Sequence, residues 1–203
     1  MSLLIGLTGG IGSGKSMAAS FFEEFGAHII DADKLSRDLV HPGQTALNEI
    51  VDYFGENILD TTGNLNRKKL AGIIFQKPDA KLALEGILHP KIFAKEHEEF
   101  LSFSSRDPLA IVIIDAALLI ESGHYKHVDR VILVRSSRET QIQRILNRND
   151  FSIEEIDARI NNQMSFEEKS EFADYILDND LQPEDLRKNV QDLYPKLLDI
   201  SES

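Results

Sequence analysis

The feature that most constrains this chain is a glycine-rich motif close to its N-terminus. Residues 9–16 read GGIGSGKS, which matches the pattern G-x-x-x-x-G-K-[ST] in full. Glycines let the backbone aim successive N–H groups at one point. The apolar run Leu3–Thr8 precedes the motif and helical spacing begins at Lys15, so the unpaired N–H groups of that helix face the same anion. The motif predicts a strand, a phosphate-binding loop and a helix.

Two side chains of the motif carry groups that a nucleoside triphosphate needs. Lys15 supplies a mobile positive charge for the β- and γ-phosphates, and Ser16 supplies a hard oxygen for Mg²⁺. A dinucleotide-binding loop is a weaker alternative. Its G-x-G-x-x-G pattern needs a third glycine where Lys15 stands, although Asp31 follows at a suitable distance for the acidic residue of that fold. The motif therefore favours a nucleoside triphosphate bound with Mg²⁺.

Short apolar runs alternate with segments of helical spacing along most of the chain. The expected strands are residues 3–8, 27–30, 109–116, 128–134 and 175–177. The expected helices are residues 15–25, 34–40, 137–146, 153–162, 166–172 and 183–198. This alternation predicts an α/β fold with three layers and a parallel sheet of about five strands.

The segment between Thr45 and Phe103 interrupts this alternation. It holds no convincing strand and is expected to be a helical insertion, with helices at residues 70–75 and 80–103. Pro90 lies inside the second helix, which predicts a break near His89. Residues 102–108 are polar and are expected to form a loop.

Composition narrows the possible partners. The formal net charge is −12, from 22 Lys and Arg against 34 Asp and Glu. A field of that sign disfavours nucleic acids and anionic membranes, so neither is expected as a partner. The absence of cysteine excludes disulfides, thiolate zinc sites and a cysteine nucleophile. No apolar run is long enough to span a bilayer and no leader is evident, so we expect a cytoplasmic protein that is a monomer or weak oligomer.

The class of phosphate-loop protein can be narrowed from two further segments. The apolar strand that ends at Asp115 is not followed by Glu, unlike in ATPase motors, and Asn147–Asp150 lacks the lysine of a guanine-reading motif. Small-molecule kinases remain. Asp31-Ala32-Asp33 follows the second expected strand, where a carboxylate can orient a hydroxyl and accept its proton. The alternative is a solvated turn with an Asx hydrogen bond.

At this point the chain resembles the dephospho-coenzyme A kinase family over nearly its whole length. The resemblance is carried by an ordered set of segments: LTGGIGSGKS (7–16), IDADKLSR (30–37), LEGILHP (84–90), DAALLIESG (115–123), VDRVILV (128–134), QIQRILNRN (141–149), ARINNQM (158–164) and ADYILDND (173–180). It implies a P-loop kinase that transfers the γ-phosphate of ATP to the ribose 3′-hydroxyl of dephospho-CoA, the last step of CoA synthesis. A nucleoside monophosphate kinase and a non-catalytic nucleotide-binding regulator are the alternatives.

The resemblance also implies an organisation within a single P-loop kinase domain. The core is expected at about residues 1–33, 106–137 and 173–203. A helical subdomain for the CoA substrate is expected at about 34–105, and a lid region at about 138–170.

Site residues follow from the same resemblance. Asp33 resembles the general base, and the catalytic set further comprises Lys15, Arg144 and Arg148. The metal ligands would be Ser16 and Asp115, and the acceptor substrate would contact Asp33, Arg37, His89 and Leu118. The residues that resemble the nucleotide cradle are Gly10, Ile11, Gly12, Ser13, Gly14, Lys15, Ser16, Met17 and Asn179, the last on the adenine side. The chain departs from the family pattern at Met17, Ala117 and Ile120.

Two pairs of residues have simpler interpretations. Arg144 and Arg148 are one helical turn apart, as in many exposed helices whose charges serve solubility alone. His124 and His127 could suggest a metal pair, but with no cysteine and no third ligand nearby they are expected to be surface histidines.

Overall fold

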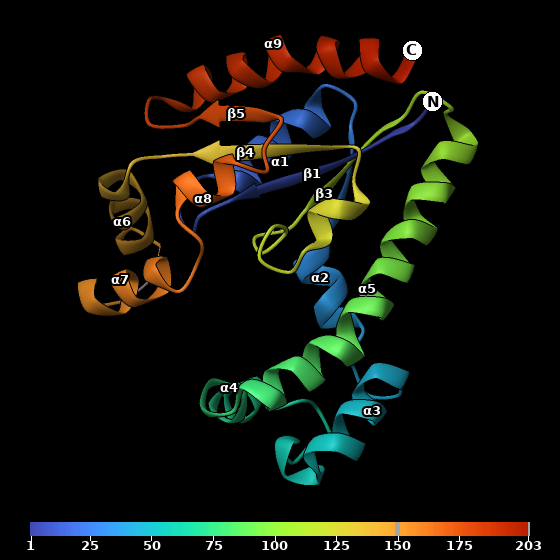
Figure 1. Ribbon diagram of the computed structural model, residues 1–203, viewed down its shortest axis with the longest axis vertical. Coiled ribbons are helices and arrows are strands. Elements are labelled where there is room, and N and C mark those ends of the chain that lie inside the picture. The colour runs from blue at the N-terminus through green and yellow to red at the C-terminus, as the bar shows by residue number, and fades with distance from the viewer. Residues whose placement is uncertain (149–150, 203) are drawn as a thin grey trace. The chain divides into compact units, whose positions relative to one another are not determined.

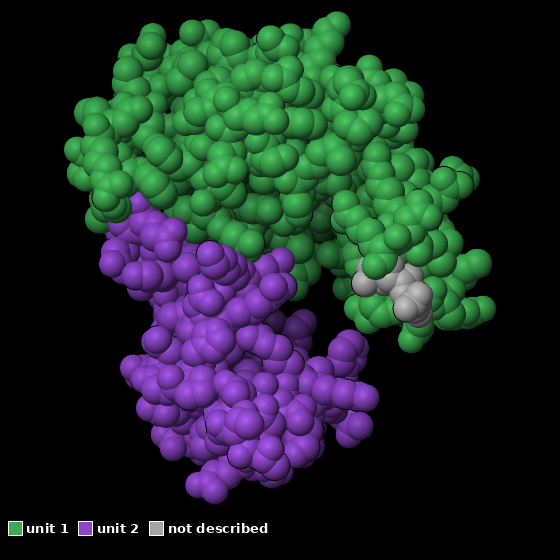
Figure 2. Space-filling model, turned by 180° about the vertical axis from the view of Figure 1, so that it is seen from behind, with its two compact units in different colours: residues 1–31, 100–203 green, residues 32–99 purple. Residues whose placement is uncertain are grey.

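The computed structural model describes residues 1–148 and 151–202. Asn149 and Asp150 of the expected lid region therefore lie outside the described residues, and Asn149 is also the last residue of the quoted segment 141–149. The chain forms two units, coloured in Figure 2. Unit 1 comprises Met1–Asp31 and Phe100–Ser203, and unit 2 comprises Ala32–Glu99. Each is described by itself below.

The sheet of unit 1 is built from short apolar strands. β1 (Leu3–Gly9) and β3 (Ile111–Asp115) are almost continuously buried, as expected for central strands of a parallel sheet. The others are β2 (His28–Asp31), β4 (Arg130–Arg135) and β5 (Tyr175–Asp178). All four pairings are parallel and the order is β2-β3-β1-β4-β5. The prediction of an α/β fold with five parallel strands is confirmed (Figure 1).

Register places the carboxyl ends of the central strands together. Leu7 of β1 pairs with Asp115 of β3, which in turn pairs with Asp31 of β2. In parallel sheets with crossover connections, ligands bind beyond this end of the strands. The loop after β1 and the carboxylate of Asp115 therefore lie at the edge where a site is expected.

Unit 1 also contains helices, some of which pack on the sheet. They are α1 (Lys15–Glu24), α6 (Arg138–Leu146), α7 (Ile153–Asn161), α8 (Phe166–Ser170), α9 (Pro183–Glu202) and the short η2 (His124–His127). α1 and α9 pack with β1 and β3 in one apolar cluster, which includes Phe22, Ile5, Ile113 and Val190 (Figure 1). Burial of these large side chains is the main stabilisation of the unit.

Unit 2 is helical and has a core of its own. It contains α2 (Ala32–Asp38), α3 (Thr45–Phe54), η1 (Glu56–Ile58), α4 (Arg67–Gln76) and α5 (Pro78–Arg106) up to Glu99. The side chains of Val40, Ile50, Ile58 and Leu70 are buried together in its centre. Within residues 32–99 the extended pairing that the structure describes is one isolated bridge, Leu59 to Leu65, so the expected helical insertion is confirmed.

Two expectations for α5 are wrong. No break occurs near His89, because α5 continues through Pro90 to Arg106, and the loop expected at 102–108 is helical up to Arg106. Proline inside a helix costs about 3 kcal/mol. Leu84, Ile87 and Leu88, in the turns before Pro90, pack on the core of unit 2. These contacts offset the proline penalty and the helix continues.

The start of α2 also differs from the expectation. The helix begins at Ala32, directly after β2, so Asp33 lies in the first turn of a helix and not in a turn before residue 34. A carboxylate is stabilising there because the helix dipole is positive at its N-terminus.

A buried glutamate in α5 predicts a pH-dependent stability. Glu96 is buried, and burial, helped by the charge of Glu99, raises its pKa from 4.5 to about 8. The folded protein then binds more protons than the unfolded chain between about pH 4.5 and 8, so stability falls as pH rises through that window. The expected loss is a few kcal/mol, at about 1.4 kcal/mol per pKa unit. Glu96→Gln should flatten urea-unfolding stability over this range.

The matched control is Glu23→Gln, at an exposed position of α1. This variant should keep the pH dependence of the unmodified chain. An unchanged slope in Glu96→Gln would contradict the assignment to Glu96.

Among the described residues no helix is both long enough and apolar enough to cross a membrane.

Candidate phosphate-binding site

The loop between β1 and α1 has the backbone conformation that its glycines predict. Gly12 has φ 77° and Gly14 has φ 91°, both in the left-handed region that other residues rarely adopt. The N–H of Ser13 donates to the carbonyl of Gly10 at 3.0 Å, which closes the loop into a tight turn. This curvature is what a phosphate-binding loop requires.

The N-terminus of α1 is open to an anion. Gly14 is the N-cap and provides no side-chain acceptor, and the first turn contains no acidic residue. The carbonyl of Gly14 accepts from the N–H groups of Met17 and Ala18, so the helix begins at Lys15. The positive end of the helix dipole is therefore directed at the loop, with no carboxylate in the first turn of the helix itself.

Lys15 is held by an acid from the neighbouring strand. Its ammonium forms an ion pair with the carboxylate of Asp115, and the two side chains are only 13% and 10% exposed. Because β3 lies next to β1, this pair joins the helix that follows the loop to the end of the adjacent strand. A lysine in this position can exchange a carboxylate for phosphate oxygens with little movement of its stem.

Arg144 and Asn179 support the loop from the other side. Arg144 Nη1 donates to the carbonyl of Ser13 at 3.2 Å, and its Nη2 donates to the carbonyl of Asn179 at 2.9 Å. Asn179 is buried and its Nδ2 donates to the carbonyl of Ser13 at 2.7 Å. Burial lowers the pKa of Arg144, partly offset by the charge of Asp180. α6 and the end of β5 thus meet at the loop.

For three other predicted residues of unit 1 the structure shows no side-chain contact with the loop among the residues it describes. Arg148 is exposed beyond the end of α6, Leu118 is exposed in the segment after β3, and Met17 packs on the core of unit 1. Their roles stay predictions.

Three predicted residues belong to unit 2. Asp33 and Arg37 are exposed and lie four residues apart on α2, so they share a face of that helix. His89 is half-buried in α5, with its ring stacked on Phe93 at 5.7 Å between centroids. Their assignment to the acceptor substrate stays a prediction.

The two histidines of η2 differ from each other. His127 is exposed as expected, but the expectation of a surface position is wrong for His124, which is buried. Gly123, with φ 76°, starts η2 and turns His124 inward.

Residues that sequence reasoning missed also contact the loop. Gln163 accepts a hydrogen bond from the N–H of Ile11, and the backbone of Gln141 lies so close to Gly12 that a Cβ there would be 2.8 Å from its carbonyl oxygen. Neither residue stands in a pattern that predicts such a contact. Gln163 falls inside one of the quoted segments, which was the only available signal.

The residues present fit a magnesium ion. Mg²⁺ is usually held by one or two protein oxygens together with nucleotide phosphates and water. The hydroxyl of Ser16 is exposed in the first turn of α1, and the carboxylate of Asp115 ends the strand beside β1. Residues 1–148 and 151–202 contain no group of three His, Asp or Glu side chains that could hold a metal.

The close approach of Asn179 to the loop gives a testable prediction. A Cβ at Gly14 would lie 2.0 Å from Asn179 Nδ2, and φ there is 91°. Left-handed backbone costs a non-glycine residue about 1–2 kcal/mol. Displacing the buried amide of Asn179 costs about 1–3 kcal/mol more. We expect Gly14→Ala to lose both amounts of unfolding free energy, measured by urea denaturation, and to weaken nucleotide binding at least tenfold.

Gly43 offers a matched control, because its φ is 90° and a Cβ there would meet nothing within 4 Å. Gly43→Ala should therefore show the backbone cost alone and keep nucleotide binding. Equal losses of stability in the two variants would contradict the close approach of Asn179.

Comparison with known proteins gives a consistent result. The family model described as dephospho-CoA kinase matches residues 3–185. A protein of that name from a strain of Bacillus cereus is 41% identical over 183 residues, covering 89% of this chain and 90% of its own length. One from Aquifex aeolicus is 41% identical over 193 residues, covering 95% and 96%.

Solved structures agree with the sequence comparison. Dephospho-CoA kinase from Campylobacter jejuni superposes with a TM-score of 0.72 at 28% identity, covering 98% of both chains. Shikimate kinase from Acinetobacter baumannii superposes with a TM-score of 0.51 at 18% identity, covering 98% of this chain and 94% of its own. At 18% identity, the similarity to shikimate kinase shows only that the two chains share a fold.

Proposed function

This chain belongs to the dephospho-CoA kinase family, and on that premise we propose how its residues carry out the reaction. The reaction is the ATP-dependent phosphorylation of dephospho-CoA, the last step of CoA synthesis. The single observation that carries it is the family match over residues 3–185. The phosphate loop, with Lys15 held at its mouth by Asp115, supports ATP as the phosphoryl donor.

Asp33 is the general base in this proposal. Its carboxylate accepts the proton of the 3′-hydroxyl as that oxygen bonds to the γ-phosphorus and the bond from the γ-phosphorus to the bridging oxygen breaks, which releases ADP. The exposed position of Asp33 in the first turn of α2 supports the role, because a hydroxyl group can reach a carboxylate that no other side chain covers.

Cationic and N–H groups gather the phosphates. Lys15 pairs with the β- and γ-phosphates, Gly10–Ser16 and Met17 supply the cradle, and Arg144 with Arg148 offset charge on the transferring group. The contact of Arg144 with the carbonyls of the loop supports its place in this set. Asn179 lines the adenine side. Ser16 and Asp115 would hold Mg²⁺, which when bound neutralises part of the phosphate charge.

The acceptor side is proposed for the helical unit. In that unit Arg37 meets a phosphate of dephospho-CoA and His89 contacts the acceptor, and Leu118 of unit 1 is proposed as a further contact of the acceptor. Residues 34–105 then form the substrate subdomain, residues 138–170 the lid that excludes water, and residues 1–33, 106–137 and 173–203 the core. The chain would act in the cytoplasm as a monomer or weak oligomer, without nucleic acid, in keeping with its net charge of −12.

The test is ADP release from ATP with and without dephospho-CoA, at saturating Mg²⁺. Turnover should depend on dephospho-CoA, and the product should carry one added phosphate by mass. EDTA in excess of the metal should abolish turnover. The alternative of a nucleoside monophosphate kinase is tested by offering a panel of nucleoside monophosphates as acceptors. Release of ADP with one of these acceptors but not with dephospho-CoA would overturn the proposal.

A further inference from the structure

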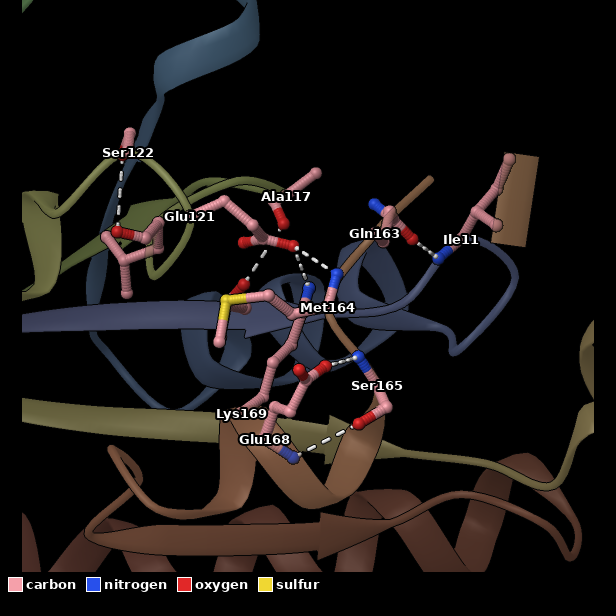
Figure 3. A network of polar contacts seen from close by, with 11 residues as sticks. Ile11, Ala117, Glu121, Ser122, Gln163, Met164, Ser165, Glu168 and Lys169 are labelled. Carbon is pink, nitrogen blue, oxygen red and sulfur yellow. Dashed lines mark hydrogen bonds and ion pairs between the residues drawn. The ribbon is translucent and has the colours of Figure 1, made fainter. Parts of the chain in front are cut away.

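A glutamine outside the phosphate loop holds one end of it. The Oε1 atom of Gln163 accepts a hydrogen bond from the N–H of Ile11 at 2.8 Å. Gln163 lies between α7 and α8, far along the chain from the loop. Figure 3 shows its side chain directed at the Ile11 nitrogen. This N–H is thus committed to the protein, as is that of Ser13, which leaves the N–H groups of Gly12 and of Gly14 to Ser16 for an anion.

The segment that carries Gln163 is fixed by a buried acid from another part of the chain. Glu121, in the segment after β3, accepts from the N–H of Met164 at 3.3 Å through its Oε1 atom. The same oxygen lies 2.8 Å from the ammonium of Lys169. Figure 3 shows both groups directed at this carboxylate. Met164 directly follows Gln163, so the contact fixes the backbone next to the glutamine.

Burial makes this anchor strong. The side chain of Lys169 is 1% exposed and that of Glu121 is 19% exposed. Removing one partner would leave the charge of the other largely buried and uncompensated, so the pair couples α8 to the segment after β3. Ser165 and Glu168 form a capping box at the start of α8. The residues from Gln163 to Lys169 are therefore fixed at both ends and in the middle.

A small cavity lies between this segment and the loop. Its volume is about 80 Å³ and its wall includes Gly10, Ser136, Gln141, Gln163 and Lys169. The loop is therefore not packed tightly against the segment along its whole length. The hydrogen bond from Ile11 to Gln163 is the direct polar link that the described residues show between the two.

We propose that Gln163 is a positioning residue of the phosphate loop, and that the buried Glu121–Lys169 ion pair sets the position of Gln163. A loop ordered before the nucleotide arrives loses less conformational freedom on binding, so the link raises affinity for the phosphates of ATP. The inference rests on the proposed function for the identity of the ligand.

The test is a titration of each variant with ATP and Mg²⁺ in the absence of acceptor. Gln163→Met removes the acceptor oxygen at nearly constant volume. We expect its Kd for ATP to rise about 5- to 10-fold, as for the loss of one ordinary hydrogen bond. The KM for dephospho-CoA and the thermal midpoint should stay unchanged. A merely structural role would instead lower the midpoint and the active fraction and leave the Kd of the folded molecules as before.

The role of the ion pair is tested in a second background. Glu121→Leu with Lys169→Met removes both charges together, so that no lone charge is buried. In that background Gln163→Met should change the Kd less than twofold, because Gln163 has already lost its anchor. Should the doubly substituted chain not fold, Glu121→Gln takes its place, read out by faster hydrogen exchange of the Ile11 amide. The matched control is Gln191→Met, at an exposed position of α9, which should bind ATP normally.

The outcomes are distinct. An unchanged Kd in Gln163→Met overturns the proposal, provided that the unmodified chain binds ATP. A Kd raised by the same factor in both backgrounds overturns the part played by the ion pair. If the unmodified chain does not bind ATP, that result contradicts the proposed function, and this inference fails with it.

Discussion

Replacing Asp33 with Asn is expected to lower kcat by about two to four orders of magnitude, the usual contribution of general acid–base catalysis. The amide keeps the size of the carboxylate and its ability to accept a hydrogen bond, but it does not take the hydroxyl proton. Binding of ATP should survive, because the phosphate loop and Lys15 are unchanged. The measurements are turnover with dephospho-CoA and titration with ATP in the absence of acceptor.

A matched control lies on the same helix. Asp38→Asn changes an exposed carboxylate of α2 that the mechanism does not use, and its kcat should stay within about twofold of the unmodified chain, as for surface substitutions in general. Turnover near normal in Asp33→Asn would contradict the role of Asp33 as base. A joint loss of turnover and ATP binding would indicate that the substitution disturbs the fold instead.

The phosphate loop could be predicted because its chemistry is local. A strand followed by four glycines, a lysine and a serine within eight positions is enough to orient N–H groups and start a helix. The left-handed φ values of Gly12 and Gly14 and the start of α1 at Lys15 agree with that pattern. The order of strands and helices was also predictable, since the apolar runs are short and well separated.

The contacts around the loop were less predictable because they join distant segments. Arg144 and Asn179 were assigned from resemblance, and their hydrogen bonds to the carbonyl of Ser13 emerge only when α6 and the end of β5 come together. Gln163 has no local pattern at all. A side chain that acts through one hydrogen bond leaves no periodicity or spacing to detect.

The helix α5, which continues through Pro90, shows a second reason why part of the fold could not be predicted from the sequence. Local preference predicts a break, since proline removes one N–H and crowds the preceding turn. Tertiary contacts of the turns before Pro90 with the core of unit 2 outweigh that preference. A local conformational preference of a few kcal/mol at one residue decides whether a helix continues only where tertiary packing favours neither outcome.

Removing the charge of Lys15 is expected to have the second largest effect. Lys15→Met should lower kcat/KM for ATP by about two to three orders of magnitude, because one preorganised donor to the developing phosphate charge is lost. The matched control is Lys188→Met, at an exposed position of α9, which should leave turnover unchanged. Turnover with varied ATP at saturating dephospho-CoA measures the effect.

The same substitution should also affect stability, for a separate reason. Without Lys15 the carboxylate of Asp115, only 10% exposed, loses its ion-pair partner. Breaking a buried pair on one side costs about 3 kcal/mol or more, so the free energy of unfolding should fall by that amount in Lys15→Met. Lys15→Met combined with Asp115→Asn should recover much of it, since no lone charge is then buried. Urea denaturation of the three variants, Asp115→Asn included, tests this.

The combined variant separates the effect of Lys15 on stability from its effect on catalysis. If Lys15 acts on the phosphates, the combined variant stays as inactive as Lys15→Met although its stability returns, and Asp115→Asn alone reports how much of the loss belongs to the carboxylate. Recovery of turnover together with stability would mean that Lys15 serves only to neutralise Asp115. In the proposed mechanism the ammonium of Lys15 exchanges the carboxylate of Asp115 for phosphate oxygens, whereas in the structure the same ion pair stabilises a buried acid.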